Sequence, residues 1–129
     1  MRLSIPSSAF GDRISMMLNA KAYTEDTLAF IISYTGKTTE MLEVARELVR
    51  VGSGTVSLTS VKPNDLVDLC TYNLFVDSTE SWNRLGGMSS RISTLNLIDI
   101  LFTALINSDY QKFTQNMSKN MVNNESRPN

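Results

Sequence analysis

Blocks of apolar and polar residues alternate along the chain and predict strands and helices in turn. Residues 28–34, LAFIISY, form a continuous apolar run that ends in a turn, a pattern typical of a strand buried on both faces. Residues 38–50, TTEMLEVARELVR, place apolar side chains at helical spacing, so we expect one stripe of this helix to face a core. Gly52 and Gly54 follow and are expected to end the helix.

The rest of the chain continues this alternation. Further strands are expected at residues 2–5, 19–23 (NAKAY), 54–60 and 71–76, and further helices at 9–18, 64–70 and 91–106. The helix at 91–106 is apolar around most of its circumference, so we expect it to be central or buried against a partner subunit. Alternating strands and helices predict an α/β sandwich with a mostly parallel sheet.

Composition limits the chemistry that the chain can perform. The 129 residues suffice for one domain, which we place at 1–110, followed by a polar C-terminal tail at 111–129 that is expected to fray. The absence of histidine removes His-based nucleophiles, His-ligated metals and imidazole acid–base chemistry, and we expect neither a metal site nor a cofactor. The single cysteine, Cys70, lies in an apolar periodic stretch and is expected to be a buried structural thiol.

Charge and hydropathy narrow the range of partners. The net charge is −1 and the 12 basic residues are scattered, whereas a nucleic-acid site needs clustered Lys and Arg. No continuous run reaches the roughly 18 apolar residues of a membrane span, and the first residues lack the apolar region of a signal peptide. We therefore expect a cytoplasmic protein that contacts no membrane and does not bind nucleic acid directly.

The turn after the first apolar run, SYTGKT at residues 33–38, ends like a nucleotide-binding P-loop. The P-loop pattern G-x-x-x-x-G-K-[ST] needs its first glycine at the position of Ile31, so a cradle for a triphosphate is not expected. The turn still offers three hydroxyls, a glycine that permits a sharp bend and a following helix N-terminus, a combination that binds a monophosphate. The alternative that these hydroxyls only cap the helix stays open.

The same turn resembles the phosphate loop of a known family. ISYTGKT is similar to the loop of sugar isomerase (SIS) domains, whose pattern is S-x-[ST]-G-x-T at the end of a strand. Four segments resemble, in this order, the SIS domain of RpiR/MurR-type bacterial transcription regulators: ISYTGKTTEMLEVARELVRVG, VSLTS, DLVDLCTYNLFV and RLGGMSSRISTLNLIDILFTALI. The resemblance covers residues 28–108 and implies a three-layer α/β sandwich with a mostly parallel sheet and flavodoxin-like winding.

The resemblance also implies a ligand, a phosphorylated sugar. Its phosphate would bind the hydroxyls and the glycine turn of residues 33–38, with a further hydroxyl from a serine pair near the N-terminus. A second serine pair, at the start of the long helix, would lie near the sugar. The residues assigned in this way are Ser7, Ser8, Ser33, Thr35, Gly36, Lys37, Thr38, Ser89 and Ser90. The helix at 91–106 would form a homodimer.

Three features depart from the family pattern. Lys37 stands where the family loop commonly has glutamate. If NAKAY is the second strand of the family, only residues 24–28 separate it from the next strand, too few for a parallel crossover, so residues 1–27 look abbreviated. The helix-turn-helix domain of these regulators has no counterpart, so we expect either a fragment or a stand-alone effector domain.

Three functions are compatible with this interpretation. The first is a phosphosugar-sensing effector domain of a transcription regulator, without enzymatic activity. The second is an aldose–ketose phosphosugar isomerase, which needs a base over its substrate, and with no histidine and a lysine at position 37 the remaining acid is Glu80. The third is a degenerate domain that keeps the dimer but has lost the ligand, as the shortened N-terminal half would suggest.

Overall fold

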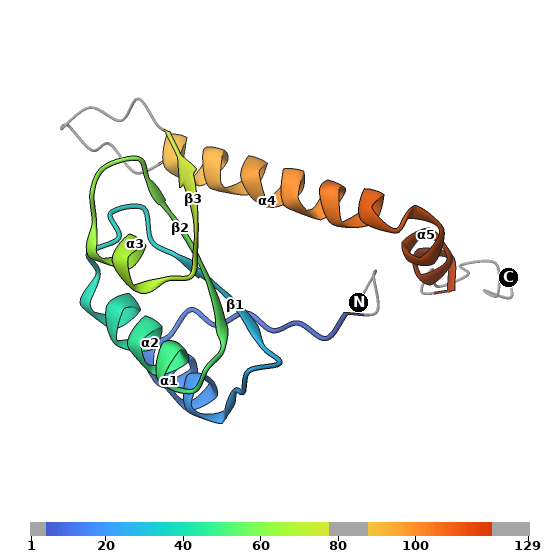
Figure 1. The fold of residues 1–129 in the computed structure, drawn as a ribbon. Coiled ribbons are helices and arrows are strands. Elements are labelled where there is room, and N and C mark those ends of the chain that lie inside the picture. The colour runs from blue at the N-terminus through green and yellow to red at the C-terminus, as the bar shows by residue number, and fades with distance from the viewer. Residues whose placement is uncertain (1–4, 78–87, 120–129) are drawn as a thin grey trace, which may run out of the picture. The chain divides into compact units, whose positions relative to one another are not determined.

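The computed structural model describes residues 5–77 and 88–119 (Figure 1). Its elements are α1 (Arg13–Ala22), β1 (Leu28–Ile32), α2 (Thr39–Arg50), β2 (Gly54–Ser60), α3 (Asp65–Leu69), β3 (Tyr72–Val76), α4 (Met88–Ser108) and α5 (Tyr110–Lys119). They fall into two units, one formed by Phe10–Leu97 and one by the residues before and after it. The expected strand at 2–5 lies mostly outside the described residues.

The first unit is built on a parallel sheet. Its three described strands lie in the order β1-β2-β3, and both pairs run parallel. The registers join Ile32 to Leu58 and Leu58 to Leu74, so the carboxyl ends of the strands come together at one edge. The predicted α/β class with a mostly parallel sheet is confirmed.

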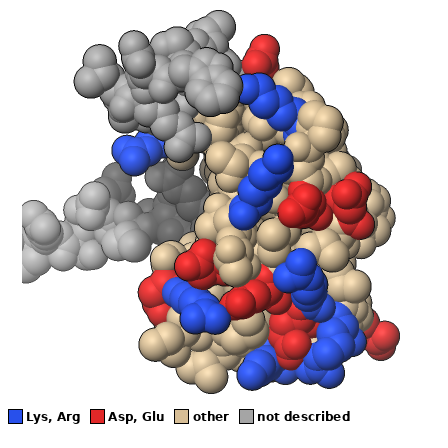
Figure 2. Space-filling model, turned by 90° about the vertical axis from the view of Figure 1, so that its left-hand side faces the viewer, with Lys and Arg blue, Asp and Glu red and all other residues tan. Residues whose placement is uncertain are grey.

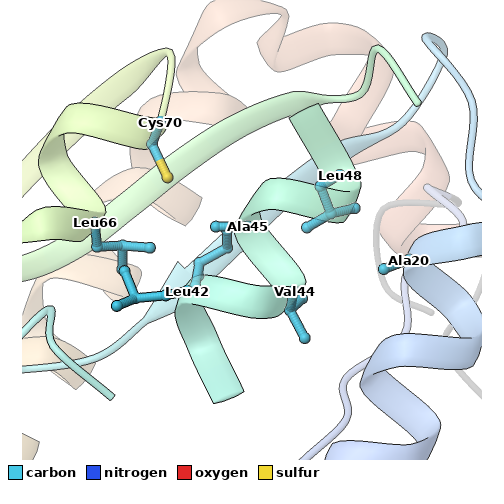
Figure 3. Close-up of a cluster of buried hydrophobic side chains, with 8 residues drawn as sticks. Ala20, Leu42, Val44, Ala45, Leu48, Leu66 and Cys70 are labelled. Carbon is cyan, nitrogen blue, oxygen red and sulfur yellow. The ribbon is translucent and has the colours of Figure 1, made fainter. Parts of the chain in front are cut away.

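Helices α1, α2 and α3 share one core with one face of this sheet. The buried apolar residues of that core are Ala20, Ile31, Leu42, Val44, Ala45, Leu48, Leu66 and Cys70. Figure 3 shows how the side chains of Leu42 and Leu66 meet between α2 and α3. The apolar stripe predicted for residues 38–50 therefore faces the sheet, as expected. Gly52 follows the helix at a φ of 81°, the left-handed conformation of a helix stop.

The opposite face of the sheet is only partly covered among the described residues. In the central strand, Val56 and Leu58 are buried, but Phe30 on β1 is 50% exposed and Tyr72 on β3 is 62% exposed. Leu28 and Ile32 also leave about half of their surface open. The prediction that LAFIISY is buried on both faces is therefore wrong for β1, because an apolar run does not reveal what lies over it.

The segment NAKAY is not a strand but the end of helix α1. The helix begins at Arg13 because Asp12 caps it, accepting a bond from the Ser15 N–H at 2.8 Å, which lowers the pKa of the Asp12 carboxyl. It continues to Ala22, and Ala20 enters the core. The expected strand at 19–23 is wrong, and the helix expected at 9–18 is instead α1 at Arg13–Ala22. The shortage of residues for a crossover was inferred from that strand, so it no longer applies.

Helix α4 is longer and more exposed than expected. Ile92 and Leu95 are 64% and 62% exposed, and a window of 18 residues within Ser89–Ser108 has a mean hydropathy of 1.2. By length and composition this helix could cross a membrane, which the search for an unbroken apolar run missed because Asn96 and Asp99 interrupt it. Length and composition do not make it a span, because core helices of soluble proteins meet the same criteria.

Part of the predicted polar tail is helical. Residues 110–119 form α5, whose Phe113 is 7% exposed, so the expectation that the tail frays is wrong for this stretch. Residues 120–129 lie outside the described part of the chain. The placement of a domain boundary at residue 110 stays a prediction.

The shared core makes a prediction about stability. Leu66 is fully buried between α2 and the sheet, so Leu66→Ala is expected to lower the free energy of unfolding by about 2–5 kcal/mol, as large-to-small core changes do. Val61→Ala, at a position that is 60% exposed, should change it by less than about 0.5 kcal/mol. Urea unfolding followed by circular dichroism measures both values. Equal effects at the two positions would contradict the assignment of the core.

Candidate functional site

The turn of residues 33–38 stands at the carboxyl edge of the sheet, between β1 and α2. Two backbone bonds extend the pairing with β2 into the turn: Ser33 N donates to Leu58 O at 3.1 Å and Ser60 N donates to Tyr34 O at 2.8 Å. The Gly36 N–H closes the bend onto Ser33 O at 2.9 Å. The turn is therefore anchored to the sheet. We call residues 33–38 the phosphate loop, after the loop of SIS domains that their sequence resembles.

The hydroxyls at the two ends of the loop meet. Ser33 Oγ and Thr38 Oγ1 lie 3.2 Å apart, within hydrogen-bond distance. Thr38 is the N-cap residue of α2, yet its side chain makes no capping bond to the helix. The alternative that the loop hydroxyls only cap the helix is therefore wrong for Thr38. Helix geometry leaves the first N–H groups of α2 without a partner inside the helix, and N–H groups in this position attract anions.

Gly36 is required by its conformation and by its neighbour. Its φ is 61°, a region that residues with a Cβ atom rarely adopt. A Cβ atom at this position would lie 1.9 Å from Asn64 Oδ1 and 2.8 Å from Asn64 Cβ. The Gly36 carbonyl accepts a bond from Leu66 N at 3.1 Å. The loop thus lies directly against the residues that start α3.

Thr35 and Lys37 form the outer part of the loop, and both are exposed. Lys37 N donates to Thr35 Oγ1 at 3.4 Å, a long bond within the turn. The Lys37 side chain makes no ion pair with a described residue. Its charge is consequently free to add to the positive end of the α2 dipole.

The two serine pairs of the expected site lie before α1 and at the start of α4. Ser89 and Ser90 begin α4 as predicted, and Ser90 is buried, but their part in a ligand site stays a prediction. Ser7 and Ser8 are exposed and precede α1. Their part in a ligand site also stays a prediction.

Among the described residues, neither Cys70 nor a cluster of acidic side chains indicates a second site. Burial raises the pKa of the Cys70 thiol, which disfavours the reactive thiolate, in agreement with a structural role. Among the described residues, no group of His, Cys, Asp and Glu could hold a metal ion. Glu80, the acid considered for an isomerase, lies outside the described residues.

Surface charge does not form a basic patch on the face shown in Figure 2. Blue Lys and Arg side chains alternate with red Asp and Glu side chains over this face. The described residues form two ion pairs, Arg13 with Glu43 at 2.8 Å and Arg50 with Glu47 at 2.7 Å. On this face, then, nothing resembles the clustered charge of a nucleic-acid site.

The family assignment follows from a match over most of the chain. Residues 1–104 match the model of the SIS domain. The chain belongs to the SIS-domain family, and the match includes residues 1–27, where the resemblance read from the sequence was weakest.

The curated relatives are bacterial regulators. One is an uncharacterized HTH-type transcriptional regulator of Caldanaerobacter subterraneus, 35% identical over 121 residues that make up 92% of this chain and 43% of the relative. Another is the HTH-type transcriptional regulator HexR of Pseudomonas aeruginosa, 30% identical over 94% of this chain and 43% of the relative. The chain thus spans less than half the length of these relatives.

A solved structure shares the fold. The Vibrio vulnificus NanR protein complexed with ManNAc-6P superposes with a TM-score of 0.82 over 92% of this chain and 44% of that chain. The sequence identity is 24%, so the similarity supports the fold assignment alone.

Sequence reasoning recognised the loop but missed the residue beneath it. Asn64 begins the helix expected at 64–70 and caps α3, since Val67 N donates to its Oδ1 at 3.2 Å. Its contact with Gly36 joins positions 28 residues apart. A capping Asn carries no sequence signal for such a contact.

The conformation of Gly36 generates a second prediction. Gly36→Ala is expected to lower the free energy of unfolding by more than about 1–2 kcal/mol, because the left-handed backbone disfavours Ala and the new methyl group would overlap Asn64. Gly11→Ala is the matched control, since nothing lies within 4 Å of a Cβ atom there. Thermal or urea unfolding of both variants measures the difference. A Gly36→Ala protein as stable as the control would show that the loop adopts another conformation.

Proposed function

We propose that this chain is a phosphosugar-binding effector domain of an RpiR-type transcription regulator. The observation that carries the proposal is the loop at the start of α2, where Thr38 pairs with Ser33 instead of capping the helix. Two hydroxyls thus meet at the N-terminus of α2, where helix N–H groups have no partner within the helix. This combination suits the acceptor oxygens of a phosphate. Thr35 and Lys37 would complete the contacts from the exposed side of the loop.

The relatives support a regulatory role. Those with 30% identity or more are HTH-type transcriptional regulators, and the NanR structure of the same fold contains ManNAc-6P, a phosphorylated sugar. A sensor domain acts by binding its ligand more tightly in one conformation than in another, and it needs no catalytic group. Such a domain would work in the cytoplasm, where phosphorylated sugars and DNA are both present.

The isomerase alternative has less support in the residues. Aldose–ketose isomerisation moves a proton between adjacent carbons and needs a base over the substrate. The chain has no histidine, and the loop position that commonly holds glutamate in the family is Lys37. The degenerate-domain alternative rested on a missing crossover after a strand at 19–23, and those residues belong to helix α1 instead.

The exposed helix α4 suits a homodimer. Its apolar side chains occupy most of its circumference, and several of them are largely exposed in the single chain, among them Ile92, Leu95 and Ile100. Packing against a second copy would bury them. A membrane is a less suitable environment, because Asp99 stands near the middle of the helix, where a charge costs about 2.5–3.5 kcal/mol.

Ligand binding makes a third prediction. Thermal unfolding of the purified chain should shift upward with one member of a panel of hexose, pentose and amino-sugar phosphates, including N-acetylmannosamine 6-phosphate. A ligand at a hundred times its dissociation constant adds about 2.7 kcal/mol of stability. Ser33→Ala and Thr38→Ala should remove most of the shift, because each deletes one of the paired hydroxyls.

The controls separate the ligand site from stability. Ser53→Ala removes a buried hydroxyl bonded to Thr24 O at 2.8 Å, at the opposite end of β2 from the loop, and should keep the ligand shift. ATP tests for a nucleotide site and should give no shift. A folded chain that responds to no sugar phosphate, or to ATP alone, would contradict the proposed function.

The dimer makes a fourth prediction. Leu95→Glu, which places a charge at a position that is 62% exposed in the single chain, should convert a dimer into monomers in sedimentation velocity. Asn96→Glu is the matched control, because it adds the same charge at the adjacent exposed polar position. A wild-type chain that sediments as a monomer at micromolar concentration would rule out this dimer.

A further inference from the structure

Hydrogen bonds to both polar atoms of its side chain hold Asn64 in one orientation. Its Nδ2 donates to Thr59 Oγ1 at 3.2 Å and to Lys62 O at 2.9 Å, and its Oδ1 accepts from Val67 N at 3.2 Å. The residue is 7% exposed. A buried amide with both its donors and its acceptor engaged resists rotation, because any other rotamer leaves polar groups without partners.

The phosphate loop rests on this fixed amide. A Cβ atom at Gly36 would come within 1.9 Å of Asn64 Oδ1 and 2.2 Å of Asn64 Cγ, so the glycine backbone sits directly on the side chain. Leu66 N, two residues after Asn64, donates to Gly36 O at 3.1 Å. The start of α3 therefore both supports the loop and pulls one of its carbonyl groups inward.

The direction of the carbonyl groups decides what the loop presents to a ligand. Tyr34 O accepts from Ser60 N and Gly36 O accepts from Leu66 N. Both carbonyl groups therefore point towards residues 60–66, which connect the end of β2 to the start of α3. In a trans peptide the carbonyl and the N–H point in opposite directions, so the N–H groups of Thr35 and Lys37 point away from residues 60–66. On that outer side the Lys37 N–H also makes a long bond of 3.4 Å to Thr35 Oγ1, which a ligand would have to replace or share. Outward N–H groups attract a phosphate, whereas outward carbonyl oxygens would repel it.

From these contacts we propose that Asn64 is the positioning residue of the phosphate loop, holding Gly36 in the conformation that presents N–H groups to the anion. The proposal rests on the proposed function for its ligand but not for its geometry. Asn64 does not touch the phosphate. It acts through Gly36, and it joins the loop to the end of β2 through Thr59.

The variant that isolates this role is Asn64→Ser. Serine keeps an oxygen that can cap α3, so the helix should remain stable. It loses the amide donors to Thr59 and Lys62 and leaves space beneath Gly36, so the loop peptides can rotate. Val61→Ser is the matched control, because it lies in the same connection and is 60% exposed.

Two measurements by NMR on the whole chain test the proposal. The first is the dissociation constant of inorganic phosphate and of N-acetylmannosamine 6-phosphate, from shifts of the Gly36 and Thr38 amide signals. We expect about tenfold weaker binding for Asn64→Ser and no change for Val61→Ser. The second is amide hydrogen exchange without ligand. Exchange at Gly36 and Leu66 should accelerate in Asn64→Ser, while the amides of residues 44–50 in α2 keep their protection.

The outcomes distinguish this proposal from the proposed function. Binding by Asn64→Ser within twofold of wild type would overturn it, and so would unchanged exchange at Gly36 and Leu66. Acceleration throughout α2 would indicate a purely structural role and would also overturn it. If the wild-type chain binds neither probe, the proposed function fails, and the exchange measurement alone then supports or rejects the positioning role of Asn64.

Discussion

The parallel pairing of β1 with β2 is the constraint on which the rest of the described sheet and its edge depend. Two consecutive parallel strands need a crossover, and α2 supplies it, with its apolar stripe on the sheet and its N-terminus at the carboxyl edge. The same pairing brings the turn after β1 beside the turn after β2. A helix N-terminus and a set of hydroxyls therefore meet because of strand direction, before any ligand is considered.

In the proposed site, the attraction for anions would come from backbone groups rather than from clustered cations. Lys37 is the one basic residue of the loop, and its side chain is exposed. The remaining attraction comes from the α2 dipole, from N–H groups and from the hydroxyls of Ser33 and Thr38. Such groups keep their charge distribution at any physiological pH. Binding by the loop should then follow the ionisation of the phosphate more than that of the protein.

Sequence reasoning succeeded where local pattern determines local structure. The stripe in TTEMLEVARELVR and the turn at Gly36 predicted α2 and the loop, and residues 54–60 form β2 as expected. It failed where distant residues decide. NAKAY alternates like a strand, but the Asp12 cap and the burial of Ala20 make it helical. The apolar residues of β1 and α4 did not reveal which of their faces the described residues would leave exposed. The contact between Gly36 and Asn64 depends on the packing of two loops, which a local pattern does not predict.

The partly open face of the sheet couples the stability of this chain to its concentration. Phe30 and Tyr72 expose apolar surface on that face, and β1 forms an edge of the described sheet with no charged residue among Leu28–Ile32. Uncharged apolar edge strands readily accept a further strand from another molecule. Any association that covers this surface stabilises the folded chain by mass action. The apparent melting temperature would then rise with the concentration of the protein or of its partner.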